Sequence, residues 1–184
     1  LVELPKSRFL LIDTGLNQYS ARTLINHLYH ARPEQLDIIV THADQDHAGG
    51  LPFIISHYPQ ARIHHGGWIQ STQLSTSSIR RGMTLNLGSD VRVRILNPIL
   101  FGSENKDAVV IRLEYGNTAV LFTGDIDSST EKRLINEFDT FLPADILKAA
   151  HHGSNTSSSL SFSRRVAAKW VIFSTGMNNR FGHP

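Results

Sequence analysis

One segment constrains this chain more than any other: an apolar run, Asp37–Thr41, leads directly into His42-Ala-Asp44-Gln-Asp46-His47. Four potential metal ligands therefore fall within six residues at the end of a predicted strand, where a loop can turn them toward one point. His42 and Asp44 are two residues apart and can share one direction, and the adjacent Asp46 and His47 can serve a second ion. A solvated polar turn is the simpler interpretation of any one of these residues, but four at this spacing favour a metal site.

Short strand-like runs and helix-like runs alternate along the chain. The predicted strands are 8–13, 37–41, 61–65, 91–96, 109–115, 118–123, 145–149 and 170–174. Helices are predicted after Ser20 as N-cap and after Ser128, which would form a capping box with Glu131; shorter ones are predicted near Gly49 and over 160–168. Strands mixed with helices predict a layered α/β domain. No repeat or linker interrupts the pattern, so we expect a single domain over 1–184.

Composition narrows the chemistry. The 184 residues include no cysteine, which excludes disulfides and thiolate ligands, so that a metal must be held by His, Asp, Glu or backbone oxygen. No apolar run approaches the roughly 20 residues of a membrane span. A net charge of +2 permits nucleic-acid binding without requiring it. Both ends of the sequence are abrupt, and we expect a piece of a longer protein, truncated at both ends.

The segment from His42 to Gly50 resembles the metal-binding signature of the metallo-β-lactamase superfamily, His-x-His-x-Asp-His followed by Gly-Gly. It departs from that signature at Asp44, where a second His is usual. The variant resembles the C-terminal hydrolase domain of the ComEC family of competence DNA-uptake channels. The resemblance covers almost the whole chain and implies an αββα metallo-β-lactamase sandwich.

Two carboxylates gain roles from the resemblance. Asp13 ends the strand in 9–15 and corresponds to the superfamily's Asp that orients the histidine loop from behind. Asp125 follows the strand in 121–125 and corresponds to the carboxylate that bridges two ions. Without the resemblance, both would be read as turn residues.

The segment 147–154 resembles the Leu-Lys-x-x-His-His-Gly-Ser motif of the ComEC group. It implies that one of His151 and His152 is a metal ligand, with His152 favoured, and that the other faces the substrate. Ser154 and Thr156 are candidates for hydrogen bonds to phosphate oxygens, although a serine-rich loop is usually only a loop.

The last segment, 174–184, resembles the ComEC stretch with Ser-x-Gly, Asn and Gly-His-Pro. Asn179 and His183 would then approach the scissile phosphate, with His183 a proton donor to the leaving oxygen. We therefore expect Asp46, His151 and His183 to take part in the chemistry. A frayed chain end is the competing interpretation of this segment.

The expected ligands are His42, Asp44, Asp46, His47, Asp125 and His152. The further His that many superfamily members carry before the Gly-Asp hairpin has no counterpart in 102–108, where Asn105 and Asp107 stand. Three carboxylates against three imidazoles favour two Mn²⁺ ions, with Zn²⁺ as the alternative.

The resemblance implies a nuclease in which a hydroxide activated by two metals attacks the phosphodiester of the DNA strand that is not transported. Its partners would be single-stranded DNA and the rest of a membrane channel with an OB-fold domain. The fragment itself would be soluble and monomeric, and the parent protein would hold it outside the inner membrane. The alternatives are a small-molecule metallohydrolase of the same superfamily and a catalytically inactive DNA-binding module.

The remaining histidines predict little chemistry. His64 and His65 end a strand outside any matched motif, and structural roles are favoured for them. His27, His30 and His57 lie in predicted helices and are expected at the surface. Trp68 could stack on a base, but a core or exposed tryptophan is the simpler interpretation.

Overall fold

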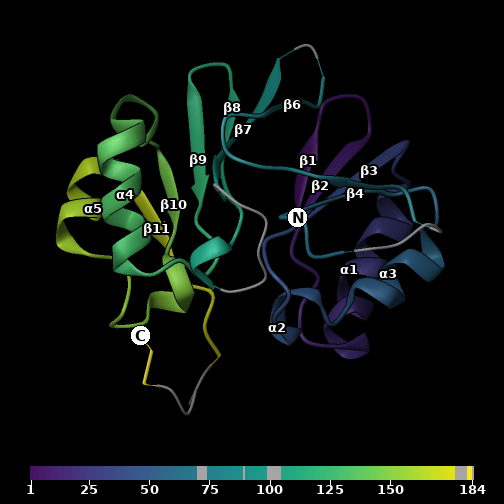
Figure 1. The fold of residues 1–184 in the computed structure, drawn as a ribbon. Helices are drawn as coiled ribbons and strands as arrows, with labels where there is room; N and C mark the ends of the chain where they lie inside the picture. Colours follow the sequence, from purple (N-terminus) through teal and green to yellow (C-terminus); the bar gives the residue numbers. More distant parts are fainter. Residues whose placement is uncertain (70–73, 89, 99–104, 177–181, 184) are drawn as a thin grey trace. The chain divides into compact units, whose positions relative to one another are not determined.

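A computed structural model describes residues 1–69, 74–88, 90–98, 105–176 and 182–183. Two compact units make up the chain, unit 1 with residues 1–79 and 100–104 and unit 2 with residues 80–99 and 105–184. Each unit contains one β-sheet with helices (Figure 1). Among the described residues, no helix is both long and apolar enough to cross a membrane.

The sheet of unit 1 has the strand order β1-β2-β3-β4-β5. Its strands are β1 (Val2–Leu4), β2 (Arg8–Ile12), β3 (Gln35–Val40), β4 (Arg62–His65) and β5 (Thr76–Ser78), and its helices are α1 (Gln18–Ala31), α2 (Gln45–Ala48) and α3 (Leu51–His57). β1 is antiparallel to β2, and the other neighbours are parallel. The carboxyl ends of β2 and β3 therefore lie at the same edge of the sheet, which brings Asp13 and Thr41 together.

Side chains two residues apart on a strand point to the same face of the sheet, and α1 and α3 pack on the face that carries Phe9 and Leu11. Phe9 and Leu11 of β2 share a buried cluster with Ala21 and Leu28 of α1 and with Ile54 of α3. Burying these apolar side chains supplies most of the stability of such a layer. Leu24 and Ile25 of α1 pack against the same cluster, so the apolar side chains of this helix share one face.

The predicted start of that helix was wrong. Asn17 is the N-cap, and its Oδ1 accepts hydrogen bonds from the backbone N–H groups of Tyr19 and Ser20. Ser20 instead occupies the third helical position of the capping box, where its Oγ accepts from the Asn17 N–H. Asn and Ser have nearly equal N-cap preferences, so sequence alone could not choose between them.

The sheet of unit 2 has the order β11-β10-β9-β8-β7-β6. Its strands are β6 (Thr84–Asn86), β7 (Val91–Asn97), β8 (Val110–Tyr115), β9 (Thr118–Phe122), β10 (Ile146–Lys148) and β11 (Trp170–Ile172). Its helices are η1 (Asn105–Asp107), α4 (Ser128–Phe138), η2 (Asp139–Phe141), η3 (Ala150–Gly153) and α5 (Leu160–Val166). β9, β10 and β11 are parallel, so the segments that follow them leave the same edge of the sheet.

The helix α4 packs its apolar side chains on the core of unit 2. Leu134 is buried, and Ile135 and Phe138 pack against the same cluster. Its predicted N-cap, Ser128, was wrong: Asp127 is the N-cap, and its Oδ1 accepts from the Thr130 N–H. Glu131 is fully buried and accepts from the backbone N–H groups of Ser158 and Ser159, so it does not form the predicted capping box.

A polar network around the buried Asp37 joins β3, β4 and β5 in unit 1. Arg62 donates two hydrogen bonds to Asp37, at 2.8 and 2.7 Å, and His64 Nε2 lies 2.9 Å from the same carboxylate. His64 Nδ1 lies 2.6 Å from Ser77 Oγ. Burial opposes ionisation of Asp37, but the hydrogen bonds of His64 and Arg62 outweigh it and hold the pKa of Asp37 below its usual range.

This network predicts a loss of stability in acid. A carboxylate whose pKa is lower in the folded state stabilises the fold above its unfolded pKa, about 3.9, and the contribution is lost as the pH falls through the folded pKa. Urea unfolding between pH 7 and pH 3 should therefore show a falling free energy of unfolding below about pH 4. The variant Asp37→Asn should be less stable at pH 7 and show a shallower fall; equal slopes for the two proteins would contradict the assignment.

Candidate metal centre

The loop after β3 carries the first group of predicted ligands. His42 and His47 are buried, at 1% and 3% exposure, and their ring centroids are 4.1 Å apart. Asp44 precedes α2 but makes no side-chain capping bond there. Its Oδ2 lies 3.6 Å from His42 Nε2, and Asp46 Oδ2 lies 3.6 Å from His47 Nε2. The structure thus brings together the two pairs that the sequence spacing suggested.

Asp13 lies behind this loop and contacts three of its polar groups. Its carboxylate accepts from the Thr41 N–H at 2.8 Å and from the Thr41 hydroxyl at 2.9 Å, and its Oδ2 lies 2.7 Å from His47 Nδ1. The Thr41 hydroxyl also lies 3.0 Å from His42 Nδ1. A hydroxyl that donates to Asp13 can accept from His42, so both imidazoles are expected as Nδ1–H tautomers with Nε2 as the metal-binding atom.

We therefore expect Asp13→Asn to weaken Mn²⁺ binding by about 10- to 100-fold, the usual effect of removing a partner of a metal-ligating histidine. The amide offers one acceptor oxygen in place of two. Calorimetric titration with Mn²⁺ measures the effect, and Glu34→Gln, at an exposed carboxylate of unit 1, is the control. Equal affinities for the two variants would contradict a role for Asp13 in orienting the histidines.

Gly49 and Gly50 are required by close packing rather than by unusual backbone angles. Their φ values, −64° and −82°, are open to any residue. A Cβ at Gly49 would lie 2.1 Å from the Leu16 carbonyl oxygen, and one at Gly50 would lie 2.2 Å from that of Thr14. The loop that carries Asp13 thus packs directly on the backbone of the metal-ligand loop.

Replacing Gly50 with Ala is expected to lower the free energy of unfolding by about 1–3 kcal/mol, because the contacted atom belongs to the backbone and cannot rotate away. Denaturant unfolding measures the change. Gly176→Ala is the matched control, since a Cβ there would meet nothing within 4 Å. A Gly50 variant as stable as this control would show that the two loops separate easily.

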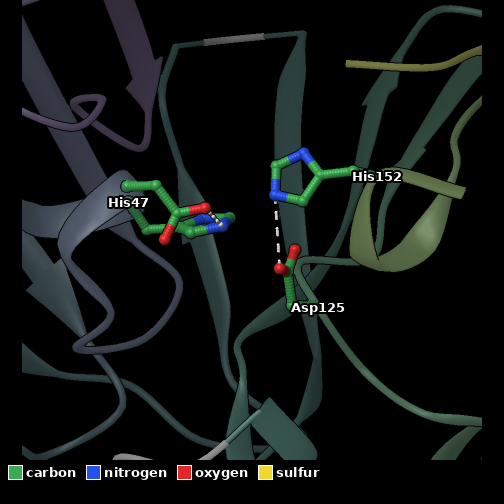
Figure 2. A group of neighbouring side chains, drawn as sticks. His47, Asp125 and His152 are labelled. Carbon is green, nitrogen blue, oxygen red and sulfur yellow. Dashed lines mark ion pairs between the residues drawn. The ribbon is translucent and has the colours of Figure 1, made fainter. Parts of the chain in front are cut away.

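The second group of predicted ligands lies in unit 2, at the carboxyl ends of its parallel strands. Asp125 follows β9 and is 3% exposed. Its Oδ2 lies 3.3 Å from His152 Nε2, as Figure 2 shows, and 4.0 Å from His151 Nε2. His152 Nδ1 donates to the Ser174 carbonyl oxygen at 2.7 Å, which again leaves Nε2 as the metal-binding atom.

The electrostatics of this group depend on Asp125. Its hydrogen bond raises the pKa of His152 above the ordinary value, although burial works in the opposite direction. Lys148 Nζ lies 3.7 Å from Asp125 Oδ1 and within 3.5 Å of the Gly124 carbonyl oxygen. Sequence analysis assigned no role to Lys148 or to Thr41, although both stand inside the segments that carried the resemblance.

Left-handed backbone occurs at three residues of these groups, out of eight such non-glycine residues in the described part of the chain. Asp13, His151 and His152 have φ values of 59°, 46° and 55°, in the left-handed region that residues other than glycine rarely adopt. Such conformations cost on the order of 1–3 kcal/mol each and cluster at functional sites. No feature of the sequence predicted these left-handed conformations.

The predicted substrate-contacting residues are placed in part. The rings of His183 and His151 have centroids 6.0 Å apart, and those of His183 and His152 are 6.4 Å apart. Ser154 Oγ lies 3.0 Å from Thr156 Oγ1, so the two hydroxyls bond one another. Asn179 lies outside the described residues.

The other histidines have local structural contacts. His64 belongs to the Asp37 network, and His65 Nδ1 accepts from the N–H groups of Gly67 and Ile69. Burial, with the nearby His64, lowers the pKa of His65. The histidines of α1 and α3 are exposed as expected. Trp68 packs against the core of unit 1, in keeping with the simpler interpretation.

The donor set fits divalent cations. Imidazole Nε2 atoms with fixed tautomers stand beside carboxylate oxygens in both groups, and this combination of ligands binds Mn²⁺ or Zn²⁺. Metal binding therefore accounts for these carboxylates better than helix capping does, since Asp44 makes no side-chain capping bond.

Comparison with known proteins identifies the family. Residues 1–174 match the metallo-β-lactamase superfamily. The chain is 30% identical to ComE operon protein 3 of Bacillus subtilis over 82% of its own length and 21% of that protein, and 30% identical to competence protein ComA of Neisseria gonorrhoeae over 97% and 26%. It thus spans about a quarter or less of the length of these relatives.

The fold agrees with that of a solved structure. The metallo-β-lactamase fold protein YhfI of Bacillus subtilis matches 92% of this chain and 76% of its own, with a TM-score of 0.60 and 14% sequence identity. The predicted fold class is therefore confirmed, and so is the resemblance to the ComEC group. The chain belongs to the metallo-β-lactamase superfamily of metal-dependent hydrolases, in the branch formed by the ComEC-type competence proteins.

Proposed function

We propose that this domain is a metal-dependent deoxyribonuclease that degrades the non-transported strand during DNA uptake. The observation that carries the proposal is the orientation of His42, His47 and His152, each with Nδ1 beside a hydrogen-bond partner and Nε2 beside a carboxylate. Kinship with competence proteins supplies the substrate class.

The ligands would be His42, Asp44, Asp46 and His47 in unit 1, and Asp125 and His152 in unit 2. Bound ions would activate a water and polarise the phosphate. Asp13 and Thr41 hold the imidazoles in the required tautomer. His151 and His183 would face the substrate, with His183 donating a proton to the leaving oxygen. Ser154, Thr156 and Asn179 would bind phosphate oxygens.

Asp44 supports manganese rather than zinc. It replaces an imidazole of the usual signature with a carboxylate, which raises the share of oxygen ligands. We propose two Mn²⁺ ions as cofactors, with Zn²⁺ as a second possibility. The domain would work on the extracytoplasmic side of the membrane, with single-stranded DNA and the rest of the parent channel, including an OB-fold domain, as partners.

The test is digestion of labelled single-stranded DNA and of bis(p-nitrophenyl) phosphate with Mn²⁺, with Zn²⁺ and with EDTA. We expect both substrates to be cleaved with Mn²⁺ and neither with EDTA. Cleavage of the small ester with intact DNA would favour the small-molecule hydrolase. DNA binding without cleavage of either substrate under any metal would favour the binding module, and activity confined to Zn²⁺ would overturn the metal assignment.

A further inference from the structure

Positive charge is concentrated in unit 2. Its residues include 13 Lys and Arg against 9 Asp and Glu, whereas unit 1 has 5 against 7. The net charge of +2 therefore conceals a basic unit and an acidic one. A basic surface on unit 2 is where a polyanion would bind.

Three arginines of unit 2 surround one carboxylate on β7 and β8. Arg112 Nε lies 2.9 Å from Glu114, Arg94 Nε lies 3.1 Å from it, and Arg92 Nη1 lies 3.7 Å from it. Burial opposes ionisation of Glu114, but the hydrogen bonds of Arg112 and Arg94 outweigh it and lower its pKa. One negative charge thus faces three positive ones. Asp90, Arg92 and Glu114 line a hollow of about 250 Å³. Even with Asp90 counted, the three arginines outnumber the two carboxylates.

The strand register makes this arrangement costly. Arg94 lies directly opposite Arg112 on the neighbouring strand, and like charges in this position destabilise a sheet. Other contacts hold the two guanidinium groups in place. Arg94 lies 4.9 Å from the ring centroid of Phe141, and Arg112 donates to the Pro143 carbonyl oxygen. Two like charges thus lie opposite one another in the sheet and are stabilised by neighbouring groups, a local exception of the kind found at functional surfaces.

The three arginine side chains differ in how far they are exposed to solvent. The side chain of Arg92 is 54% exposed, that of Arg94 29% and that of Arg112 17%. Arg92 and Arg94 are two residues apart on β7 and therefore point to the same face of the sheet. Guanidinium groups that a carboxylate has already oriented lose less rotational freedom when they bind phosphate.

We propose that Arg92, Arg94 and Arg112 form a binding site for the phosphodiester backbone of single-stranded DNA, separate from the metal ligands of unit 2. The proposal rests on the proposed function for its choice of polyanion. Arg112 pairs with Leu121 of β9, four residues before Asp125, a separation on the order of 13 Å along an extended chain. The site therefore contacts a long substrate and not a small phosphodiester.

The test is fluorescence anisotropy with a labelled 30-nucleotide oligo(dT) in EDTA, at several salt concentrations. Arg92→Gln is expected to lower the slope of log affinity against log salt by about 0.7, which corresponds to a loss of roughly five- to tenfold at ~50 mM salt. Glu114→Gln should tighten binding, because it removes a negative charge that repels phosphate while its amide oxygen can still accept a hydrogen bond from a guanidinium group. Arg164→Gln, an exposed arginine on α5 of the same unit, is the matched control and should retain wild-type affinity.

Hydrolysis of bis(p-nitrophenyl) phosphate with Mn²⁺ separates this inference from the proposed function. Arg92→Gln should leave kcat/KM for the small ester unchanged. Affinity and salt slope equal to those of Arg164→Gln would overturn the arginine site, whether or not the domain cleaves DNA. A wild type that hydrolyses neither substrate would overturn the proposed function, while the anisotropy experiment would still decide the binding site.

Discussion

Replacing Asp125 with Asn is expected to slow hydrolysis of single-stranded DNA by a factor of about 10³ or more. Metal ions contribute several kcal/mol of charge stabilisation in the transition state, and each 1.36 kcal/mol corresponds to about tenfold in rate. Asp125 is buried between His152 and Lys148, so its loss removes a carboxylate ligand and the ion-pair partner of a second ligand. The measurement is kcat/KM with saturating Mn²⁺, alongside a Mn²⁺ titration.

Asp145→Asn is the matched control: Asp145 is a carboxylate of the same unit that pairs with Lys169 at the surface and accepts from the Ala119 N–H, a bond that the amide oxygen of Asn can keep. It should keep nearly full activity. Oligonucleotide binding in EDTA should be similar in both variants. If Asp125→Asn retains cleavage within tenfold of Asp145→Asn, the metal assignment at Asp125 fails; if neither the variants nor the wild type cleave, a binding function is favoured.

Sequence spacing predicted local geometry well where neighbours in the chain form the pair. His42 with Asp44, and Asp46 with His47, lie together because a short loop leaves few alternatives. The orienting contact of Asp13 with Thr41 and His47 joins residues 28 and 34 positions apart. That contact depends on the parallel pairing of β2 with β3, which periodicity cannot establish. The role of Asp13 was predicted only from the family resemblance; without it, Asp13 would have been interpreted as a turn residue.

Strands were predicted where they are long or strongly apolar, and all eight predicted strands are present. The strands β1, β5 and β6, of three residues each, were missed, because so short a segment shows no measurable alternation. The equally short β10 and β11 lie within the longer predicted runs 145–149 and 170–174. The left-handed backbone at His151 and His152 was also beyond prediction. Their sequence is compatible with a regular strand end, and packing against Gly124 and Ser174 decides the conformation.

Glu131 of α4 was predicted to form a capping box, and its actual contacts lead to the second prediction of a large effect. A Ser followed three residues later by Glu predicts a reciprocal cap, yet Glu131 is fully buried and bonds to the N–H groups of Ser158 and Ser159 at 2.5 and 2.9 Å. Its partners lie 27 and 28 residues away in the loop that follows His151 and His152. Ser158 also has a left-handed φ of 55°, which this carboxylate holds in place.

Glu131→Ala is therefore expected to lower the free energy of unfolding by about 2–5 kcal/mol, because two backbone donors lose their acceptor and a cavity replaces the side chain. Glu131→Gln should cost less, since its amide oxygen can accept one of the two bonds. Glu137→Ala, on the exposed face of the same helix, removes a surface ion pair with Arg81 and should cost no more than about 1 kcal/mol.

Chemical denaturation of the three variants measures these differences, and Mn²⁺ titration of Glu131→Gln shows whether the effect reaches the metal ligands. Ser157 Oγ donates to the Ala150 carbonyl oxygen, so a loosened serine loop should displace η3 and weaken Mn²⁺ binding. Glu131→Ala and Glu137→Ala of equal stability would mean that the loop keeps its conformation without the buried carboxylate. The left-handed backbone of His151 and His152 would then be maintained by contacts with the strand ends alone.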